Sequence, residues 1–134
     1  MAEEAAKVSG VAKVLLVESG AYENFLAENI ATLVSNISGD YDFILAPTTT
    51  NGKNVMPRVA ALQDVSQISD ISAIESSDTF QRPIYAGNCI ATVKSNDSKK
   101  IITVRNTAFD AADASGCSAE IITLEEINDA GISK

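Results

Sequence analysis

The apolar residues in the first half of the chain follow two alternating patterns, continuous runs and helical stripes. Val11–Val17 is a nearly continuous apolar run, which is typical of a strand buried on both faces. Between Glu23 and Ile37 the apolar residues recur mostly three or four positions apart, as on one face of an amphipathic helix, and Ser38-Gly39-Asp40 ends it. Tyr41–Pro47 predicts the next strand. This order predicts a parallel sheet with right-handed crossovers.

Two further helices are predicted around these elements. A short helix from Ala2 to Val8, ended by Gly10, precedes the first strand, as in a βαβ unit that lacks its first strand. A polar loop, Thr48–Lys53, leads into a helix predicted from Asn54 to Gln63. Proline is tolerated in the first turn of a helix, so Pro57 makes Asn54 the predicted N-cap.

The second half of the chain is dominated by short segments of strand character. They cover Ile71–Glu75, Phe80–Ala86, Cys89–Lys94 and Ile101–Arg105. The polar stretch Ser95–Lys99 predicts a hairpin loop between the last two, and therefore antiparallel pairing.

A loop of small residues over 110–118 and a final short strand at Glu120–Leu124 complete the pattern, and the polar residues Asn128–Lys134 predict a frayed end. We place a possible linker start at 126–134. The predicted fold is a single α/β domain over residues 1–134. It is a Rossmann-like layered fold, with a mixed, largely parallel sheet in the first half and antiparallel strands in the second.

Composition excludes several classes of function. The chain has 134 residues, about one domain, and 46% of them are apolar. Ten basic and eighteen acidic residues give a net charge of −8, which disfavours nucleic acid and anionic membranes as partners. No stretch approaches the roughly 18 apolar residues of a membrane span, so no membrane insertion is expected.

The inventory of reactive side chains is short. The chain contains no histidine, which excludes Ser–His–Asp triads, other histidine-based acid/base catalysis and histidine metal sites. Cys89 and Cys117 lie too far apart for a CxxC motif, and two unpaired, reduced thiols are predicted. Without a complete catalytic set or a metal-ligand pattern, the chain is predicted not to be an enzyme in its own right.

The loop before the predicted helix at Asn54 is a candidate anion site. A strand, a Gly-Lys loop and a helix N-terminus together resemble a phosphate-binding turn, with Asn51, Gly52 and Lys53 as the candidate residues. The loop is not a Walker A motif, because Pro47 stands where the first glycine is needed and Asn54 replaces the Ser or Thr. Structural capping of the helix is the alternative interpretation.

Charged residues elsewhere are better explained by structure. The carboxylates of Asp64, Asp70, Asp110 and Asp113 show no catalytic or metal-binding pattern and indicate a solvated acidic face. Asp70 is the exception, because its apolar neighbours suggest partial burial and hence a backbone or arginine partner. We take three arginines, Arg58, Arg82 and Arg105, as candidates for ion pairs inside the domain or across a subunit interface.

Four motifs in register resemble the N-terminal domain of the electron transfer flavoprotein α subunit, over about residues 8 to 115. They are Gly52–Leu62 (GKNVMPRVAAL), Ile68–Ile71 (ISDI), Thr79–Asn88 (TFQRPIYAGN) and Val104–Asp110 (VRNTAFD). The residues of these motifs are most similar to those of the mitochondrial members of the family. This resemblance implies that the protein is located in the mitochondrial matrix, with bacterial cytoplasm as the alternative.

The resemblance implies a role in electron transfer. The family's heterodimer of α and β subunits holds one FAD, accepts electrons from acyl-CoA and related dehydrogenases and passes them to a membrane quinone oxidoreductase. The FAD lies mainly in the C-terminal domain of the α subunit, so none is expected to bind this chain. The resemblance thus implies a scaffold and subunit interface that packs against the β subunit.

The chain departs from the family pattern at its start. The family domain opens with a strand and a further βα unit that this sequence lacks, and an unpaired sheet edge is expected to favour self-association. The alternative function is an independent nucleotide-binding α/β module that uses the Asn51-Gly52-Lys53 loop to hold the phosphates of AMP or ATP.

Overall fold

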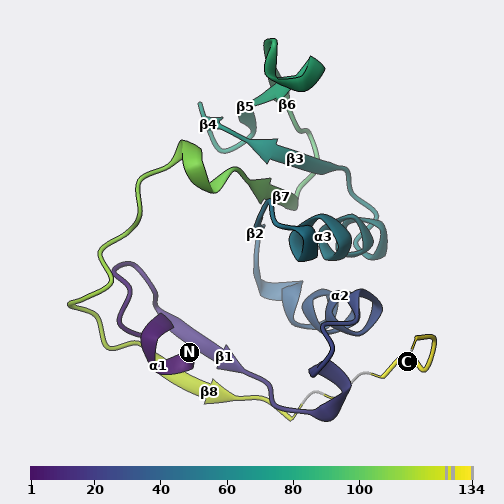
Figure 1. Cartoon of the computed structure of the whole chain (residues 1–134), viewed down its shortest axis with the longest axis vertical. Coiled ribbons are helices and arrows are strands. Elements are labelled where there is room, and N and C mark those ends of the chain that lie inside the picture. The colour runs from purple at the N-terminus through teal and green to yellow at the C-terminus, as the bar shows by residue number, and fades with distance from the viewer. Residues whose placement is uncertain (126, 128, 134) are drawn as a thin grey trace.

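A three-stranded parallel sheet forms the centre of the computed structural model, which describes residues 1–125, 127 and 129–133 (Figure 1). Its strands are β2 (Phe43–Pro47), β7 (Lys100–Val104) and β3 (Gln67–Ile71), in the order β2-β7-β3. Strand β7 is central, and its residues Ile101 and Ile102 are 0% and 1% exposed. A run of β-branched residues suits this place, because a central parallel strand is buried on both faces.

Different layers cover the two faces of this sheet. Helices α2 (Ala27–Ile37) and α3 (Thr50–Leu62) pack on one face, where Val59 and Ile101 belong to the same buried cluster. The antiparallel sheet of β4 (Ala73–Ile74), β5 (Thr79–Ile84) and β6 (Cys89–Lys94) covers β3 and β7 on the other face, through Phe80 and Ile102. The α/β layered fold class is therefore confirmed.

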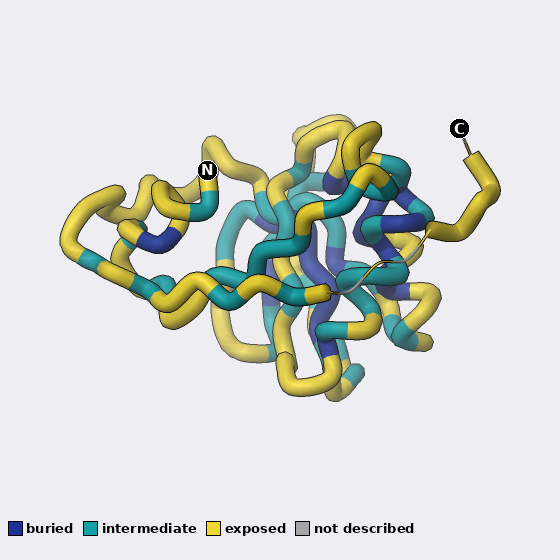
Figure 2. Tube along the Cα trace, turned by 90° about the horizontal axis from the view of Figure 1, so that it is seen from below, coloured by how far each residue is buried: buried dark blue, intermediate teal, exposed yellow. Residues whose placement is uncertain are grey.

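The two ends of the chain form a separate parallel pair. Strand β1 (Lys13–Leu16) pairs with β8 (Glu120–Thr123), and helix α1 (Ala2–Ala5) lies beside them (Figure 1). Short 3₁₀ turns span Gly20–Tyr22, Ser38–Asp40, Tyr85–Gly87 and Asn106–Ala108. Figure 2 shows that the buried residues gather in the body formed by the central sheet and its helices, whereas the part around the N-terminus is mostly exposed or intermediate.

Strands β1 and β2 do not pair with each other, although α2 connects them. Within the described residues β1 pairs only with β8, and β2 pairs only with β7. Each strand therefore has one edge without a ladder partner in the described part of the chain. Such an edge is the feature on which the expectation of self-association rests, and that expectation stays a prediction.

Two predictions about the second half of the chain are wrong. The Ser95–Lys99 stretch is not a hairpin loop, because β6 and β7 lie in different sheets, and parallel and antiparallel strands are therefore not mixed in one sheet. The run in β7 is buried on both faces, a pattern that fits a parallel strand better than half of a hairpin. The predicted strand Ile71–Glu75 is split between two sheets. Ile71 ends β3, whose register with β7 shifts between Ile68 and Ile71, and Ala73–Ile74 forms β4 of the antiparallel sheet.

The start of helix α3 also differs from the prediction. Thr49 is the N-cap, not Asn54, and its Oγ1 accepts a hydrogen bond of 3.2 Å from the Gly52 N–H. Pro57 consequently lies inside the helix and leaves the Lys53 carbonyl without its usual donor four residues on. The helix start was predicted at Asn54 because proline is normally tolerated only in the first turn of a helix.

Gly52 is required by close approach of the backbone. A Cβ atom built at this position would lie 2.0 Å from the Pro47 carbonyl oxygen, at the end of β2. The first turn of α3 can therefore rest against β2 only if residue 52 has no side chain.

The described residues near the C-terminus contact helix α2. The side chain of Asn29, which is buried, accepts a 2.9 Å hydrogen bond from the Ala130 N–H and donates one of 2.9 Å to the Ala21 carbonyl oxygen. Residues 126, 128 and 134 of the predicted linker start lie outside the described residues. The linker stays a prediction.

Two smaller expectations are answered by the structure. Cys89 and Cys117 are both free thiols, as expected. Among the described residues, no helix combines the length and the apolar character that are needed to cross a membrane.

We predict that Gly52→Ala destabilises the domain by about 1–3 kcal/mol, the usual cost of overpacking, although alanine is the better helix former. The matched control is Gly39→Ala, because nothing lies within 4 Å of a Cβ at Gly39. Urea unfolding followed by circular dichroism measures both variants. A Gly52→Ala protein as stable as the original chain would contradict the close approach.

Candidate functional site

The carboxyl ends of the three parallel strands meet at a polar cleft of about 330 Å³. It is lined by Thr48, Lys53, Asp70, Arg105, Asn106 and Thr107. Thr48 follows β2, Arg105 follows β7, and Asp70 lies near the end of β3. The carboxyl edge of a parallel sheet is the usual place for ligands and contacts in α/β folds, because loops and helix N-termini converge there.

An ion pair between Asp70 and Arg105 forms one wall of the cleft. Arg105 Nη2 lies 2.5 Å from Asp70 Oδ2, and Arg105 Nε donates to Oδ1 at 3.3 Å. Two parallel hydrogen bonds fix the direction of both side chains. The expectation that Asp70 needs an arginine or backbone partner is thus confirmed.

The backbone of Asp70 is held in an unusual conformation. Its φ of 58° lies in the left-handed region, which aspartate tolerates better than most residues. The Asp70 N–H donates a 2.8 Å hydrogen bond to Oγ1 of Thr103, a buried residue of β7. This bond fixes the turn that directs the carboxylate toward Arg105.

The charges at the cleft act on each other. The hydrogen bonds from Arg105 hold the pKa of Asp70 below its usual value, with smaller contributions from the Thr48 hydroxyl and the Lys53 charge. In return, Asp70 raises the pKa of Arg105. Two cationic side chains thus face one carboxylate, which leaves a local positive charge in a chain whose net charge is −8.

The structure places the predicted anion loop only partly at the cleft. Lys53, in the first turn of α3, lines the cleft. Gly52 donates its N–H to the Thr49 side chain, and Lys53 donates its own to the Thr49 carbonyl oxygen. Asn51 is exposed and does not line the cleft. These bonds support the capping interpretation, and an anion site stays a prediction.

The three candidate arginines do not form one site. Arg105 lines the cleft, whereas Arg58 is exposed on α3, where its charge contributes to lowering the pKa of Glu28. Arg82 lines a different pocket, beside the start of β3. Their role at a subunit interface stays a prediction.

Sequence reasoning missed Thr48, Asn106 and Thr107 as lining residues. Each follows the end of a parallel strand by one to three positions. That position was the available signal, since the carboxyl ends of parallel strands share one edge of the sheet. This signal was not used, because the segment of β7 was predicted to form an antiparallel pair.

We predict that the ion pair makes stability depend on pH in acid. The pKa of Asp70 is lowered in the folded state, so the ionised carboxylate stabilises the fold above its unfolded pKa of about 3.8, and this contribution is lost as pH falls through the lowered folded value. Asp70→Asn, which tolerates the same backbone conformation, removes the charge. The stability difference between the two proteins should be largest near neutral pH and shrink below pH of about 4.

Urea unfolding at several pH values measures this difference. The pKa of Asp78 is lowered to about 2 by hydrogen bonds from Thr79, Ser76 and Lys94, and Asp78 titrates in both proteins. Its contribution cancels in the comparison, which isolates Asp70. A difference that is the same at neutral and acid pH would contradict a stabilising charge on Asp70.

The chain is similar to known α subunits. It is 55% identical over 131 residues to the electron transfer flavoprotein subunit alpha of Pseudomonas aeruginosa, which covers 98% of this chain and 42% of that protein. The same subunit of Paracoccus denitrificans is 54% identical over 98% of this chain and 42% of its own length. The mitochondrial subunit of Dictyostelium discoideum is 47% identical over 94% of this chain and 38% of its own length.

The chain thus spans about two-fifths of the length of these curated relatives. The relatives include both bacterial and mitochondrial proteins. A model of the electron transfer flavoprotein domain matches residues 1–129, and the chain therefore belongs to this family of electron-transferring flavoproteins.

Proposed function

We propose that the chain is the part of an electron transfer flavoprotein α subunit that serves as scaffold and subunit interface. Two findings support this assignment: the family model matches residues 1–129, and the similar α subunits are more than twice as long as this chain. The FAD of the full heterodimer is then held by the remainder of the α subunit. This chain contributes the surface on which the β subunit packs, and it carries no catalytic residues of its own.

The uncovered face of β2 is the observation that carries the interface role. Ile44 and Ala46 pack against the cluster under the helices, whereas Phe43 and Leu45 on the opposite face are 42% and 51% exposed. Parallel strands are normally covered on both faces. The antiparallel sheet covers only β3 and β7, so a partner is needed over β2.

The uncovered face adjoins the charged cleft. An apolar hollow of about 260 Å³, lined by Leu45, Ala46, Pro47, Val104 and Asn106, shares Asn106 with the cleft. An apolar patch with a polar rim is the usual anatomy of a protein interface. Arg105 and Lys53 then lie where a partner can meet them at the rim.

The proposed role extends to the whole protein. As part of the heterodimer, the chain supports electron transfer from acyl-CoA and related dehydrogenases to a membrane quinone oxidoreductase. The compartment is the mitochondrial matrix, or the cytoplasm if the source is bacterial. The competing function, a nucleotide-binding module built on Lys53, rests on the position of that side chain at the cleft.

We expect Leu45→Lys to abolish most binding of the β subunit, because it places a charge in an apolar interface. The chain is co-expressed with a tagged β subunit, and the amount retained on the affinity column is measured. Leu62→Lys is the matched control, since Leu62 is a similarly exposed leucine at the end of α3. Equal retention of the two variants would contradict an interface at β2.

Two titrations test the rest of the assignment. The chain alone should not bind FAD stoichiometrically, and the absorbance of a bound oxidised flavin would overturn that expectation. Calorimetry with AMP and ATP should show no saturable binding. Saturable binding that Lys53→Ala weakens would instead favour the nucleotide-binding module.

A further inference from the structure

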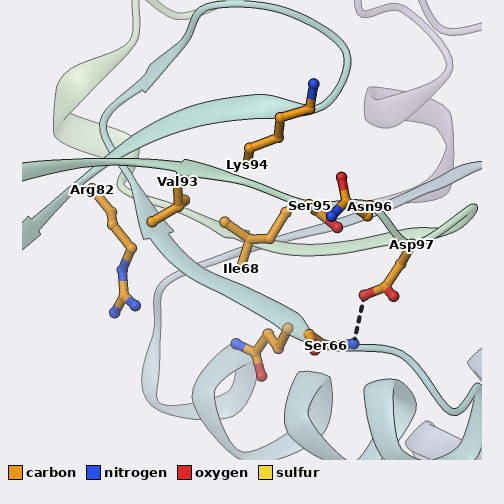
Figure 3. A pocket seen from close by; sticks show the side chains of 9 residues that line it. Ser66, Ile68, Arg82, Val93, Lys94, Ser95, Asn96 and Asp97 are labelled. Atoms are coloured by element: carbon orange, nitrogen blue, oxygen red, sulfur yellow. Dashed lines mark hydrogen bonds between the residues drawn. The ribbon is translucent and has the colours of Figure 1, made fainter.

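A second pocket lies beside the start of β3. Its volume is about 350 Å³, and it is lined by Ser66, Gln67, Ile68, Arg82, Val93, Lys94, Ser95, Asn96 and Asp97 (Figure 3). The walls come from β3, from β5 and β6 of the antiparallel sheet, and from the segment that joins β6 to β7. The volume falls within the range of small-molecule sites.

Two residues that line this pocket each carry a buried polar atom without a hydrogen-bond partner among the described residues. These atoms are Nε of Arg82 and Oγ of Ser95, each with less than 1 Å² exposed. A buried donor that is left unsatisfied lowers the stability of a fold, and more so when it belongs to a charged group. Because both residues line one pocket, the pocket is a candidate binding site.

The other charged groups of the pocket already have partners. The Asp97 carboxylate accepts a 3.0 Å hydrogen bond from the Ser66 N–H, the dashed line in Figure 3. The Lys94 ammonium lies 3.1 Å from Asp78 Oδ2. The guanidinium of Arg82 is therefore the cation that remains for a ligand.

The arrangement of the lining residues defines the shape of that ligand. Figure 3 shows Arg82 at one end of the pocket and Ser95 and Asn96 toward the other, with Ile68 and Val93 between them. An oxyanion suits the Arg82 end, and an apolar body suits the middle. Asp97 beyond Ser95 disfavours a second negative charge at the far end.

We propose that this pocket binds a small organic monocarboxylate. Its carboxylate accepts hydrogen bonds from the Arg82 guanidinium, its short apolar chain lies against Ile68 and Val93, and a polar end group reaches the Ser95 hydroxyl. A planar guanidinium matches a carboxylate through two parallel hydrogen bonds. This site is separate from the cleft and from the β2 face, so it stands whether or not the proposed function does.

The test is an NMR titration of the ¹⁵N-labelled chain with acetate, propionate and butyrate at constant ionic strength. The Nε–Hε signal of Arg82, identified by its loss in Arg82→Lys, should shift downfield and saturate. The affinity should rise by up to about fourfold for each added methylene group, because each buries apolar surface against Ile68 and Val93. The Nε–Hε signal of the exposed Arg58 serves as an internal reference and should not saturate.

Matched probes and variants sharpen the result. 1-Propanol and propylammonium carry the same propyl chain as butyrate without a carboxylate, and neither should give a saturable shift at Arg82. Arg82→Lys keeps the positive charge but removes the planar guanidinium that donates two parallel hydrogen bonds. It should weaken butyrate binding by about tenfold, which corresponds to the loss of one charge-assisted hydrogen bond. Arg58→Lys should leave binding unchanged.

Three outcomes would overturn the proposal. They are an Arg82 signal that does not saturate with any of the acids, an affinity that does not depend on chain length, and equal binding by the Arg82→Lys and Arg58→Lys proteins. If Arg82→Lys fails to fold, the Arg82 signal is assigned by elimination with Arg58→Lys and Arg105→Lys, since the chain has three arginines, and the titration of the original chain decides the question. Ser95→Ala then provides the second variant and should weaken binding of 4-hydroxybutyrate more than binding of butyrate.

Discussion

The insertion of β7 between β2 and β3 is the constraint on which the rest of this fold depends. Successive side chains of a strand point to opposite faces of a sheet. Ile101 therefore enters the cluster under α2 and α3, while Ile102 enters the cluster under the antiparallel sheet. Two adjacent residues of the central strand thus join three layers.

The same strand positions the cleft. The hydrogen-bond ladder continues past the ends of the strands, because Thr48 N–H donates to the Val104 carbonyl at 2.9 Å and Arg105 N–H donates to the Ile71 carbonyl at 3.0 Å. Thr103, also on β7, holds the backbone of Asp70. Thr48, Asp70 and Arg105 are therefore positioned by the sheet itself. The other lining residues come from the first turn of α3 and from the 3₁₀ turn after β7.

Patterns within one segment were predictable from the sequence, and pairings between segments were not. The segment of strand character at Cys89–Lys94 gave the correct bounds of β6, and the helical stripe located α2, because residue preference and spacing act within one segment. The pairing of Asp70 with Arg105 joins residues 35 positions apart, and nothing in the sequence near either residue specifies it. Spacing likewise could not tell which of Arg58, Arg82 and Arg105 forms an ion pair inside the domain, since strand register and not residue type decides which charges meet.

The two cationic sites differ in how their charge is satisfied, and this difference separates their roles. Asp70 neutralises Arg105 within the chain, so the cleft keeps its shape without a ligand. Arg82 Nε has no such partner among the described residues. A carboxylate that pairs with the Arg82 guanidinium would bind the folded state alone and would stabilise it by mass action.

Ile68 connects the pocket of Arg82 to the buried core of the fold. It lines the pocket of Arg82, and it also belongs to the buried cluster in which Phe80 joins the antiparallel sheet to the parallel one. Val93 packs against the same cluster and lines the same pocket. A small acid bound in the pocket would therefore contact the cluster that joins the two sheets, through Ile68 and Val93.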